Sequence, residues 1–186
     1  MKRRGFTLVE ILAVVAVIAI LVTLLMPAIA NLLVKTEEAR ARNEANVIAN
    51  AIADYYATVG RLPYDPSLGC SETWLTSPWD DRNVHQQSPK SESRLNVERN
   101  MLRATYQLLT TTSNPARRVF LELPLDPDSG LALDPWGNPY MVMMDCGGSG
   151  AVYGSRGMRA VVRSLGPDGE YSPEGRGGSD DIFSRM

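Results

Sequence analysis

The sequence predicts an α+β fold in which one long N-terminal helix packs on a small antiparallel sheet. An apolar run opens the chain, and a helical pattern continues from it to about residue 59. Short apolar segments between Gly- and Pro-rich turns occupy the last third of the chain, as expected for strands. A chain of 186 residues has room for one modest globular domain and one extended element.

The apolar run is long enough to cross a membrane. Residues 11–30 carry no formal charge, and Thr23 is their only polar side chain. Twenty residues at about 1.5 Å per residue span about 30 Å, the thickness of the hydrocarbon layer. Lys2, Arg3 and Arg4 precede the run, so its N-terminal end is expected in the cytoplasm and the bulk of the chain on the other side. The run therefore predicts a transmembrane helix.

An ordinary secretory signal is the alternative interpretation of this segment. Small residues at 28–30 resemble the cleavage site of such a signal. Against it, the run is longer than a signal core, Glu10 stands near its start, and the helical pattern continues beyond Asn31. A carboxylate at the edge of a hydrocarbon layer is costly unless it is paired, which makes Glu10 a candidate functional residue.

The segment from Gly5 to Glu10 reads GFTLVE, which resembles the processing motif of type IV prepilins and type II secretion pseudopilins. The resemblance implies that a prepilin peptidase cleaves between Gly5 and Phe6 and that Phe6 is then N-methylated. It also implies that the new amino group of one subunit pairs with Glu10 of its neighbour, since a buried carboxylate left alone is heavily penalised. Pro27 matches a proline before which filaments of this family tolerate a loosened helix, although a simple kink is the alternative.

These observations divide the chain into three parts. Residues 1–5 are expected to be a leader peptide, residues 6–34 a transmembrane and assembly helix, and residues 35–186 a periplasmic, pilin-like globular domain. Loss of the leader removes three basic residues and takes the formal charge from −2 to −5. A mildly acidic chain argues against nucleic acid as a partner, because such binding needs a clustered positive surface.

The helical pattern continues through residues 35–59. Charged residues crowd its first half, so that half is expected to be solvated. The apolar positions at helical spacing form one face that is expected to pack on a sheet: Ala41, Ala45, Ile48, Ile52, Tyr55 and Val59. Gly60, followed by Pro63, predicts the end of the helix.

Residues 64–120 are predicted to be a variable insertion. Residues 61–96 are polar and rich in turn-forming residues, which predicts a surface segment, and Trp74 and Trp79 are expected to attach it to the domain. The helical spacing of four residues then predicts a short amphipathic helix that buries Val97, Met101, Ala104 and Leu108.

The last third resembles major pseudopilins of type II secretion systems. Residues 141–145 and 159–164 are predicted strands. The stretch DPWGNPY at Asp134–Tyr140 resembles a signature of the major pseudopilin, and so does the glycine- and aspartate-rich tail at 164–182. The resemblance covers these segments and the N-terminal helix.

The tail segment offers oxygen ligands. Asp168, Asp180 and Asp181, together with backbone carbonyls, are the hard ligands that calcium prefers, although a solvated acidic loop is the simpler interpretation. The spacing differs from that of an EF-hand. The family resemblance implies a calcium site, with Asp168 and Asp181 as side-chain ligands, Asp180 as a further candidate, and the carbonyls of Ser164 or Leu165.

Two cysteines, Cys70 and Cys146, lie far apart in the sequence and lack metal-ligand spacing. In an oxidising compartment they are able to form one disulfide that closes a long loop, and two free thiols are the alternative.

The patterns do not favour an enzyme. The only histidine, His85, lies in the polar segment, and no phosphate-binding glycine loop follows a strand. The resemblance implies a structural subunit of a type II secretion pseudopilus that drives export of folded proteins across the outer membrane. The alternatives are a type IV pilus subunit, for adhesion, motility or DNA uptake, and a minor pseudopilin. The cysteines favour a pilin, and the DPWGNPY stretch and acidic tail favour the pseudopilin.

The partners implied by the resemblance are other copies in a helical filament, prepilin peptidase, an inner-membrane assembly platform and ATPase, minor pseudopilins and inner-membrane lipid. The expected location is the inner membrane, by a single span with a periplasmic C-terminal domain, and a periplasmic filament after assembly.

Overall fold

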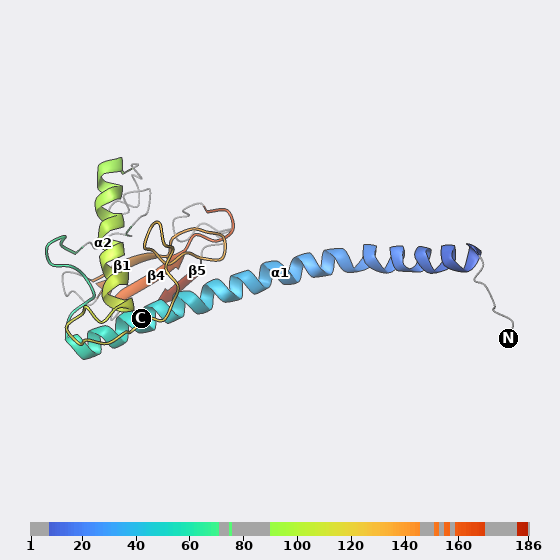
Figure 1. Cartoon of the computed structure of the whole chain (residues 1–186). Helices are drawn as coiled ribbons and strands as arrows, with labels where there is room; N and C mark the ends of the chain where they lie inside the picture. Colours follow the sequence, from blue (N-terminus) through green and yellow to red (C-terminus); the bar gives the residue numbers. More distant parts are fainter. Residues whose placement is uncertain are drawn as a thin grey trace. The chain divides into compact units, whose positions relative to one another are not determined.

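The fold was analysed in a computed structural model, which describes residues 8–70, 75, 90–145, 151–152, 155–156, 159–169 and 182–185. The chain divides into two compact units, Met1–Glu37 and Glu38–Met186, and helix α1 (Leu8–Val59) runs through both (Figure 1). The second unit adds α2 (Glu92–Thr110) and the strands β1 (Met141–Met144), β2 (Ala151–Val152), β3 (Ser155–Arg156), β4 (Ala160–Ser164) and β5 (Ile182–Arg185). The predicted α+β architecture with a long N-terminal helix and a small antiparallel sheet is therefore confirmed.

Helix α1 ends where the sequence predicts. Gly60 has a φ of +80° and donates its N–H to the carbonyl of Tyr56 over 2.8 Å, the geometry of a glycine helix terminus. The predicted buried face is also confirmed, because Ala41, Ala45, Ile48, Ile52 and Tyr55 are all buried. Val59, at the end of the face, is half-buried and packs against the core. The second half of α1 is thus the central element of the globular core.

Helix α2 begins earlier than the sequence pattern predicts, and its most deeply buried positions differ from the predicted ones. Ser91 caps its N-terminus by accepting the Arg94 N–H over 3.4 Å, so the helix includes part of the segment expected to lack regular structure. Val97 is 50% exposed, whereas the buried positions are Glu98, Leu102, Thr105, Tyr106 and Leu109. The predicted face is thus confirmed in part, because Met101, Ala104 and Leu108 are half-buried and Met101 and Leu108 pack against the core. The most deeply buried positions lie one residue further along the helix and include polar groups, which a pattern of apolar side chains does not predict.

The sheet has the strand order β1–β4–β5, with both pairings antiparallel. Met141 lies opposite Arg163, and Ser164 lies opposite Ile182. The two predicted strands at 141–145 and 159–164 are confirmed as β1 and β4. A separate two-stranded ribbon pairs β2 with β3.

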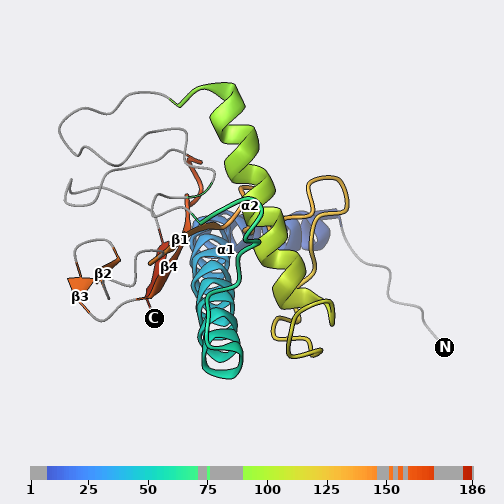
Figure 2. The same ribbon diagram turned by 90° about the vertical axis from the view of Figure 1, so that its left-hand side faces the viewer.

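Side chains alternate between the two faces of the sheet, as the strand geometry requires. Val142, Met144, Ala160 and Val162 join the main core with residues of α1 and α2, and Met141, Met143, Val161 and Leu165 form a second buried cluster. Figure 2 looks along α1, with α2 on one side of it and β1 and β4 on the other. The sheet is thus buried on both faces, and the helices cover one of them.

The segment predicted to be an insertion contributes to this core. Leu102, Tyr106 and Leu109 of α2 are completely buried, and Leu75 donates its N–H to the carbonyl of Val142 in β1 over 3.0 Å. Trp74, Trp79 and His85 lie outside the described residues. Helix α2 is therefore a structural part of the domain, whatever the origin of the surrounding segment.

Candidate functional site

The N-terminal half of α1 is apolar around its whole circumference. Every large hydrophobic side chain described between Leu8 and Val34 is exposed, with exposed fractions of 46–80%. Within the described residues, Leu8–Met26 is the one helical stretch long and apolar enough to cross a membrane, a property that a signal sequence shares. A helix that is apolar all round requires lipid or other apolar helices around it.

Two predicted assembly residues lie on this helix. Glu10 lies exposed in the first turn, and Pro27 lies within the continuous span of α1. The processing residues Gly5 and Phe6 lie outside the described residues, so cleavage and methylation stay predictions.

A second candidate site is built around the DPWGNPY turn. The Asp134 carboxylate organises the turn: its Oδ1 atom accepts N–H groups from Trp136 over 3.1 Å and from Asn138 over 2.8 Å. Gly137 adopts a φ of +91° inside the turn, a conformation that favours glycine. The motif thus encodes a turn that the Asp134 side chain organises from inside, and an antiparallel bridge between Leu133 and Pro139 closes its base.

The same carboxylate connects the turn to the sheet. Its Oδ2 atom accepts the hydroxyl hydrogen of Ser164 over 2.7 Å, at the end of β4. Burial raises the pKa of Asp134 above its ordinary value, against the opposing effect of these hydrogen bonds. Both oxygens of this buried carboxylate are therefore engaged, one by the turn and one by the sheet.

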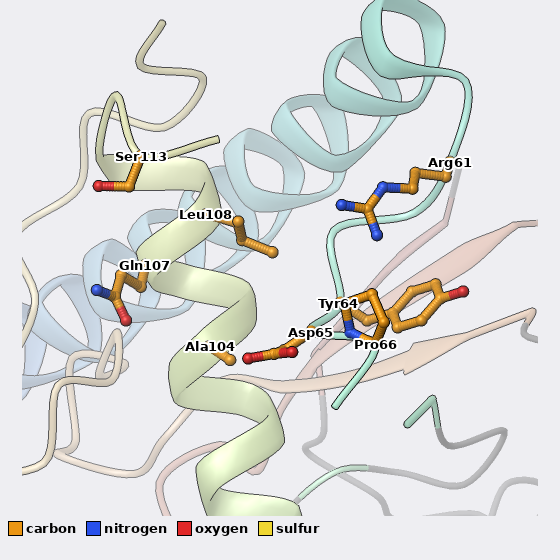
Figure 3. A pocket seen from close by; sticks show the side chains of 8 residues that line it. All are labelled: Arg61, Tyr64, Asp65, Pro66, Ala104, Gln107, Leu108 and Ser113. Carbon is orange, nitrogen blue, oxygen red and sulfur yellow. The ribbon is translucent and has the colours of Figure 1, made fainter. Parts of the chain in front are cut away.

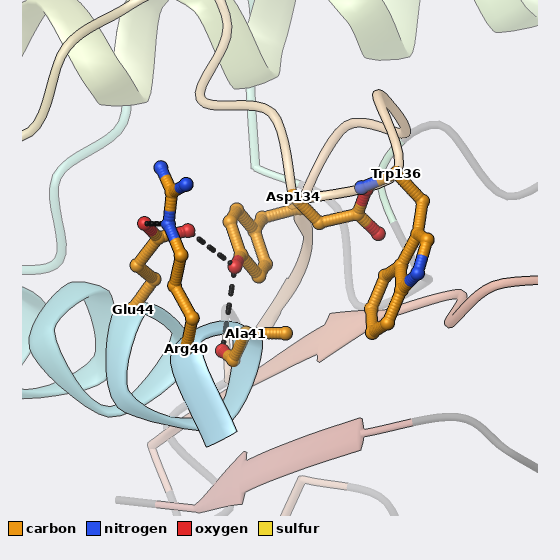
Figure 4. A network of polar contacts seen from close by, with 6 residues as sticks. Arg40, Ala41, Glu44, Asp134 and Trp136 are labelled. Atoms are coloured by element: carbon orange, nitrogen blue, oxygen red, sulfur yellow. Dashed lines mark hydrogen bonds and ion pairs between the residues drawn. The ribbon is translucent and has the colours of Figure 1, made fainter. Parts of the chain in front are cut away.

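Tyr140 connects the turn to the second half of α1. Figure 4 shows Arg40, Ala41 and Glu44 on α1 and Asp134 and Trp136 in the turn. The Tyr140 hydroxyl donates to Glu44 Oε2 over 2.8 Å and lies 3.3 Å from the carbonyl oxygen of Ala41. Glu44 also accepts from Arg40 Nε over 2.8 Å. Burial, and next the hydrogen bond to Glu44, raise the pKa of Tyr140, so its hydroxyl stays protonated as a donor at neutral pH.

The turn also contacts the start of the tail segment. The side-chain amide of Asn138 donates to the carbonyl of Gly166 over 3.2 Å. A Cβ atom at Gly169 would lie 3.2 Å from the Asn138 side-chain oxygen, so this approach requires glycine. The turn from Asp134 to Tyr140 therefore joins three elements: α1, the end of β4 and the first residues of the tail.

The structure describes three of the five predicted calcium ligands. Ser164 and Leu165 are buried at the end of β4, and Asp168 is exposed after them. Asp180 and Asp181 lie outside the described residues, which themselves contain no cluster of three or more His, Cys, Asp or Glu side chains. Ser164 pairs with Ile182, the residue after Asp181, so the strand register holds the two ends of this segment together.

Sequence reasoning missed Glu44 and the hydroxyl of Ser164 as members of this site. The four-residue spacing of Arg40 and Glu44 was a visible signal for an ion pair on a helix surface. No sequence pattern links Ser164 to Asp134 or Glu44 to Tyr140, because 30 and 96 residues separate the members of these pairs.

Cys70 is disulfide-bonded. The other cysteine of the sequence, Cys146, lies outside the described residues, and the Cys70–Cys146 pair stays a prediction.

Comparison with known proteins supports the interpretation of the N-terminal segment. The prokaryotic N-terminal methylation motif matches residues 1–26. The N-terminal segment therefore has a prepilin-type methylation motif. The chain is also similar to the fimbrial protein EcpC of Eikenella corrodens, with 33% identity over 63 residues, which are 34% of the chain and 41% of that protein. The match thus spans about two fifths of the relative's length, and no solved structure matches the chain significantly.

The motif, the apolar helix and the fimbrial relative together support a pilus or pseudopilus subunit that is anchored in a membrane and assembles into a filament. The match to the methylation motif suggests processing by a prepilin peptidase.

Proposed function

We propose that the chain is a structural subunit of a type II secretion pseudopilus that drives export of folded proteins across the outer membrane. The observation that carries the proposal is the DPWGNPY turn. The turn is held at two points: the Asp134 carboxylate accepts a hydrogen bond from Ser164 at the end of β4, and the Tyr140 hydroxyl donates one to Glu44 of α1. A filament subunit needs this rigidity, because its surface must present the same shape to every neighbour along the filament.

In the proposed mechanism, subunits wait in the inner membrane with the first half of α1 in lipid. Glu10 pairs with the Phe6 amino group of the next subunit, which fixes the axial register of the filament. The exposed apolar side chains of α1 then exchange lipid for neighbouring helices. An assembly platform and ATPase supply the extraction, and minor pseudopilins complete the filament.

Calcium is part of this proposal. The donor set of Asp168, Asp180 and Asp181 with the carbonyls of Ser164 or Leu165 has the hard-oxygen chemistry that calcium takes. The antiparallel pairing of Ser164 with Ile182 supports it, because the register brings the two ends of the acidic segment to one end of the sheet. When bound, calcium would neutralise the acidic side chains and hold the segment in one conformation.

Thermal unfolding with and without calcium tests the secretion assignment. We expect added calcium to raise the melting temperature of the parent chain, and the double variant Asp168→Ala, Asp181→Ala to lose that response. Asp128→Ala is the matched control, because it removes a carboxylate from a turn away from the tail. A melting temperature that calcium leaves unchanged in the parent would remove the calcium proposal and favour a type IV pilus subunit or a minor pseudopilin over the major pseudopilin.

A type IV pilus subunit is the second candidate, and two observations favour it. The similar protein EcpC is a fimbrial protein, and Cys70 is disulfide-bonded. The N-terminal half of α1 fits both candidates equally well. Absence of a calcium response, with Glu10 still required for assembly, would support the pilus subunit or a minor pseudopilin over the major pseudopilin.

A further inference from the structure

A pocket of about 280 Å³ opens between the segment after α1 and helix α2 (Figure 3). Its lining is divided evenly between polar side chains, Arg61, Asp65, Gln107 and Ser113, and less polar ones, Tyr64, Pro66, Ala104 and Leu108. The volume lies just below the roughly 300–1,000 Å³ of typical small-molecule sites, so the pocket admits one small unit.

The polar groups of the pocket have unused hydrogen-bonding capacity. Arg61 is half-buried, and its guanidinium has no hydrogen bond or ion pair within the described part of the chain. Its Cζ atom lies over the ring of Tyr64, 5.9 Å from the ring centroid. The side-chain amide of Gln107 is likewise without a hydrogen bond to any described residue. Arg61 and Asp65 both extend from the loop toward α2, as Figure 3 shows. A planar fork of N–H donors thus faces the pocket.

Asp65 balances the charge of Arg61 without pairing with it. One oxygen, Oδ1, accepts the Ser67 N–H over 2.8 Å and the Ser67 hydroxyl over 2.7 Å. These hydrogen bonds lower the pKa of Asp65, so the group is ionised at neutral pH. The pocket therefore holds one positive and one negative side chain, both fixed on one short segment.

This balance disfavours ligands that carry a single charge. An anionic ligand bound to Arg61 would meet the charge of Asp65, and a cationic ligand bound to Asp65 would meet the charge of Arg61. A purely apolar ligand would leave both groups desolvated without a partner. A neutral ligand that both donates and accepts hydrogen bonds satisfies the two charges and Gln107 together.

We infer that this pocket binds a single neutral sugar unit. Adjacent hydroxyl groups accept from the Arg61 fork and donate to the Asp65 carboxylate, and the apolar C–H surface of the ring packs on Leu108 and Pro66. A peptide backbone also donates and accepts, but it spaces these groups along an extended strand, whereas the pocket is compact and bounded on one side by a helix. The inference concerns a face of the globular unit and does not depend on which filament the chain builds.

The test is saturation-transfer NMR on the full-length chain in dodecylphosphocholine micelles, whose headgroup contains no sugar. The probes are methyl glycosides of glucose, galactose, mannose and N-acetylglucosamine. We expect saturable transfer to at least one glycoside. The variants Arg61→Gln and Gln107→Ala should each weaken that binding, Arg61→Gln by about tenfold or more, because it loses hydrogen bonds from a charged donor.

Arg99→Gln is the matched control, because Arg99 lies exposed on α2 outside the pocket and donates to Asn96. Two further probes, N-acetylglutamate and N-acetylalanine methylamide, represent an acidic and a neutral peptide ligand. Binding of either peptide probe without binding of a glycoside would overturn the inference. So would absence of saturable transfer from every glycoside, or equal weakening by Arg99→Gln.

Discussion

The hydrogen bond from the Tyr140 hydroxyl to Glu44 of α1 offers a direct test of how the DPWGNPY turn is attached to α1. Tyr140→Phe removes only the hydroxyl that donates to Glu44 over 2.8 Å. A hydrogen bond to a charged acceptor contributes about 1.5–3 kcal/mol, but the Glu44 side chain is 13% exposed and keeps Arg40 as a partner. Because solvent competes for the carboxylate, we expect the free energy of unfolding to fall by about 1–2 kcal/mol.

Tyr55→Phe is the matched control for this change. Tyr55 and Tyr140 both have an exposed fraction of 0%, but the Tyr55 hydroxyl has no hydrogen-bond partner among the described residues. Removing it therefore costs no hydrogen bond and relieves a buried unsatisfied group, so the stability of this variant should equal or exceed that of the parent.

Thermal unfolding by circular dichroism compares the two variants. The Glu38–Met186 unit contains every buried residue of the core and is suited to the measurement. For a domain of about 150 residues, a loss of 1–2 kcal/mol lowers the melting temperature by about 3–6 °C. A Tyr140→Phe variant that melts with the parent, or above Tyr55→Phe, would refute the argument that this hydroxyl joins the turn to α1.

Three further predictions follow from other features. Burial raises the pKa of Asp134, so its ionised form is disfavoured in the folded state. The free energy of unfolding of the parent, relative to that of Asp134→Asn, should therefore rise as pH falls from 7 toward 4. Urea unfolding measures this difference, and a difference that stays constant with pH would contradict the prediction. Glu98→Ala removes the carboxylate that binds the buried Lys90 over 2.7 Å and should cost about 3 kcal/mol, whereas Asp54→Ala, at an exposed ion pair, should cost less than about 1 kcal/mol in the same assay. Glu10→Ala should leave membrane insertion intact but impair filament assembly, seen by fractionation and electron microscopy; normal filaments would contradict the pairing.

The sequence was sufficient for the elements whose pattern is local. The apolar face from Ala41 to Tyr55 follows the helical period, and Gly60 marks the end of α1 by its own conformational freedom. The strands at Met141–Met144 and Ala160–Ser164 are short apolar runs between turns, and both were found. In each case one stretch of chain carries the whole signal.

Helix α2 shows why local pattern fails elsewhere. The apolar stripe through Val97 and Leu108 is real in the sequence, but the helix is rotated so that Glu98 and Thr105 are buried. Glu98 is tolerated there because Lys90 and Arg94 both bind its carboxylate. Burial of a charged residue depends on partners brought by the fold, so hydrophobicity alone does not predict which positions of the helix are most deeply buried.

The sequence predicted the DPWGNPY turn itself but not the hydrogen bonds that join it to β4 and α1. DPWGNPY indicates a turn through its proline, glycine and aspartate, and that turn is present. That Asp134 would bind Ser164, and that Tyr140 would bind Glu44, depends on packing between segments 30 and 96 residues apart. Contacts of that range are set by the whole core and leave no periodic trace in the sequence.

The DPWGNPY turn links the start of the tail segment to α1 through a chain of hydrogen bonds. Asp134 accepts a hydrogen bond from Ser164, Asn138 donates one to the Gly166 carbonyl, and Tyr140, two residues after Asn138, donates one to Glu44 of α1. Because the Asp134 carboxylate is buried and both its oxygens are engaged, the turn cannot shift at Ser164 without losing a bond at one end or the other. A ligand that fixed the residues after Ser164 would therefore restrain the turn, and through Tyr140 the position of α1 against the sheet. A fixed position of α1 matters most in a subunit whose helix is the part that neighbouring subunits contact. The proposed effect of calcium should therefore also be measured on the Tyr140→Phe variant, in which the attachment of the turn to α1 is weakened. If the coupling exists, loss of the hydroxyl should lower the calcium affinity and the calcium-dependent rise in melting temperature together, because the two are thermodynamically linked.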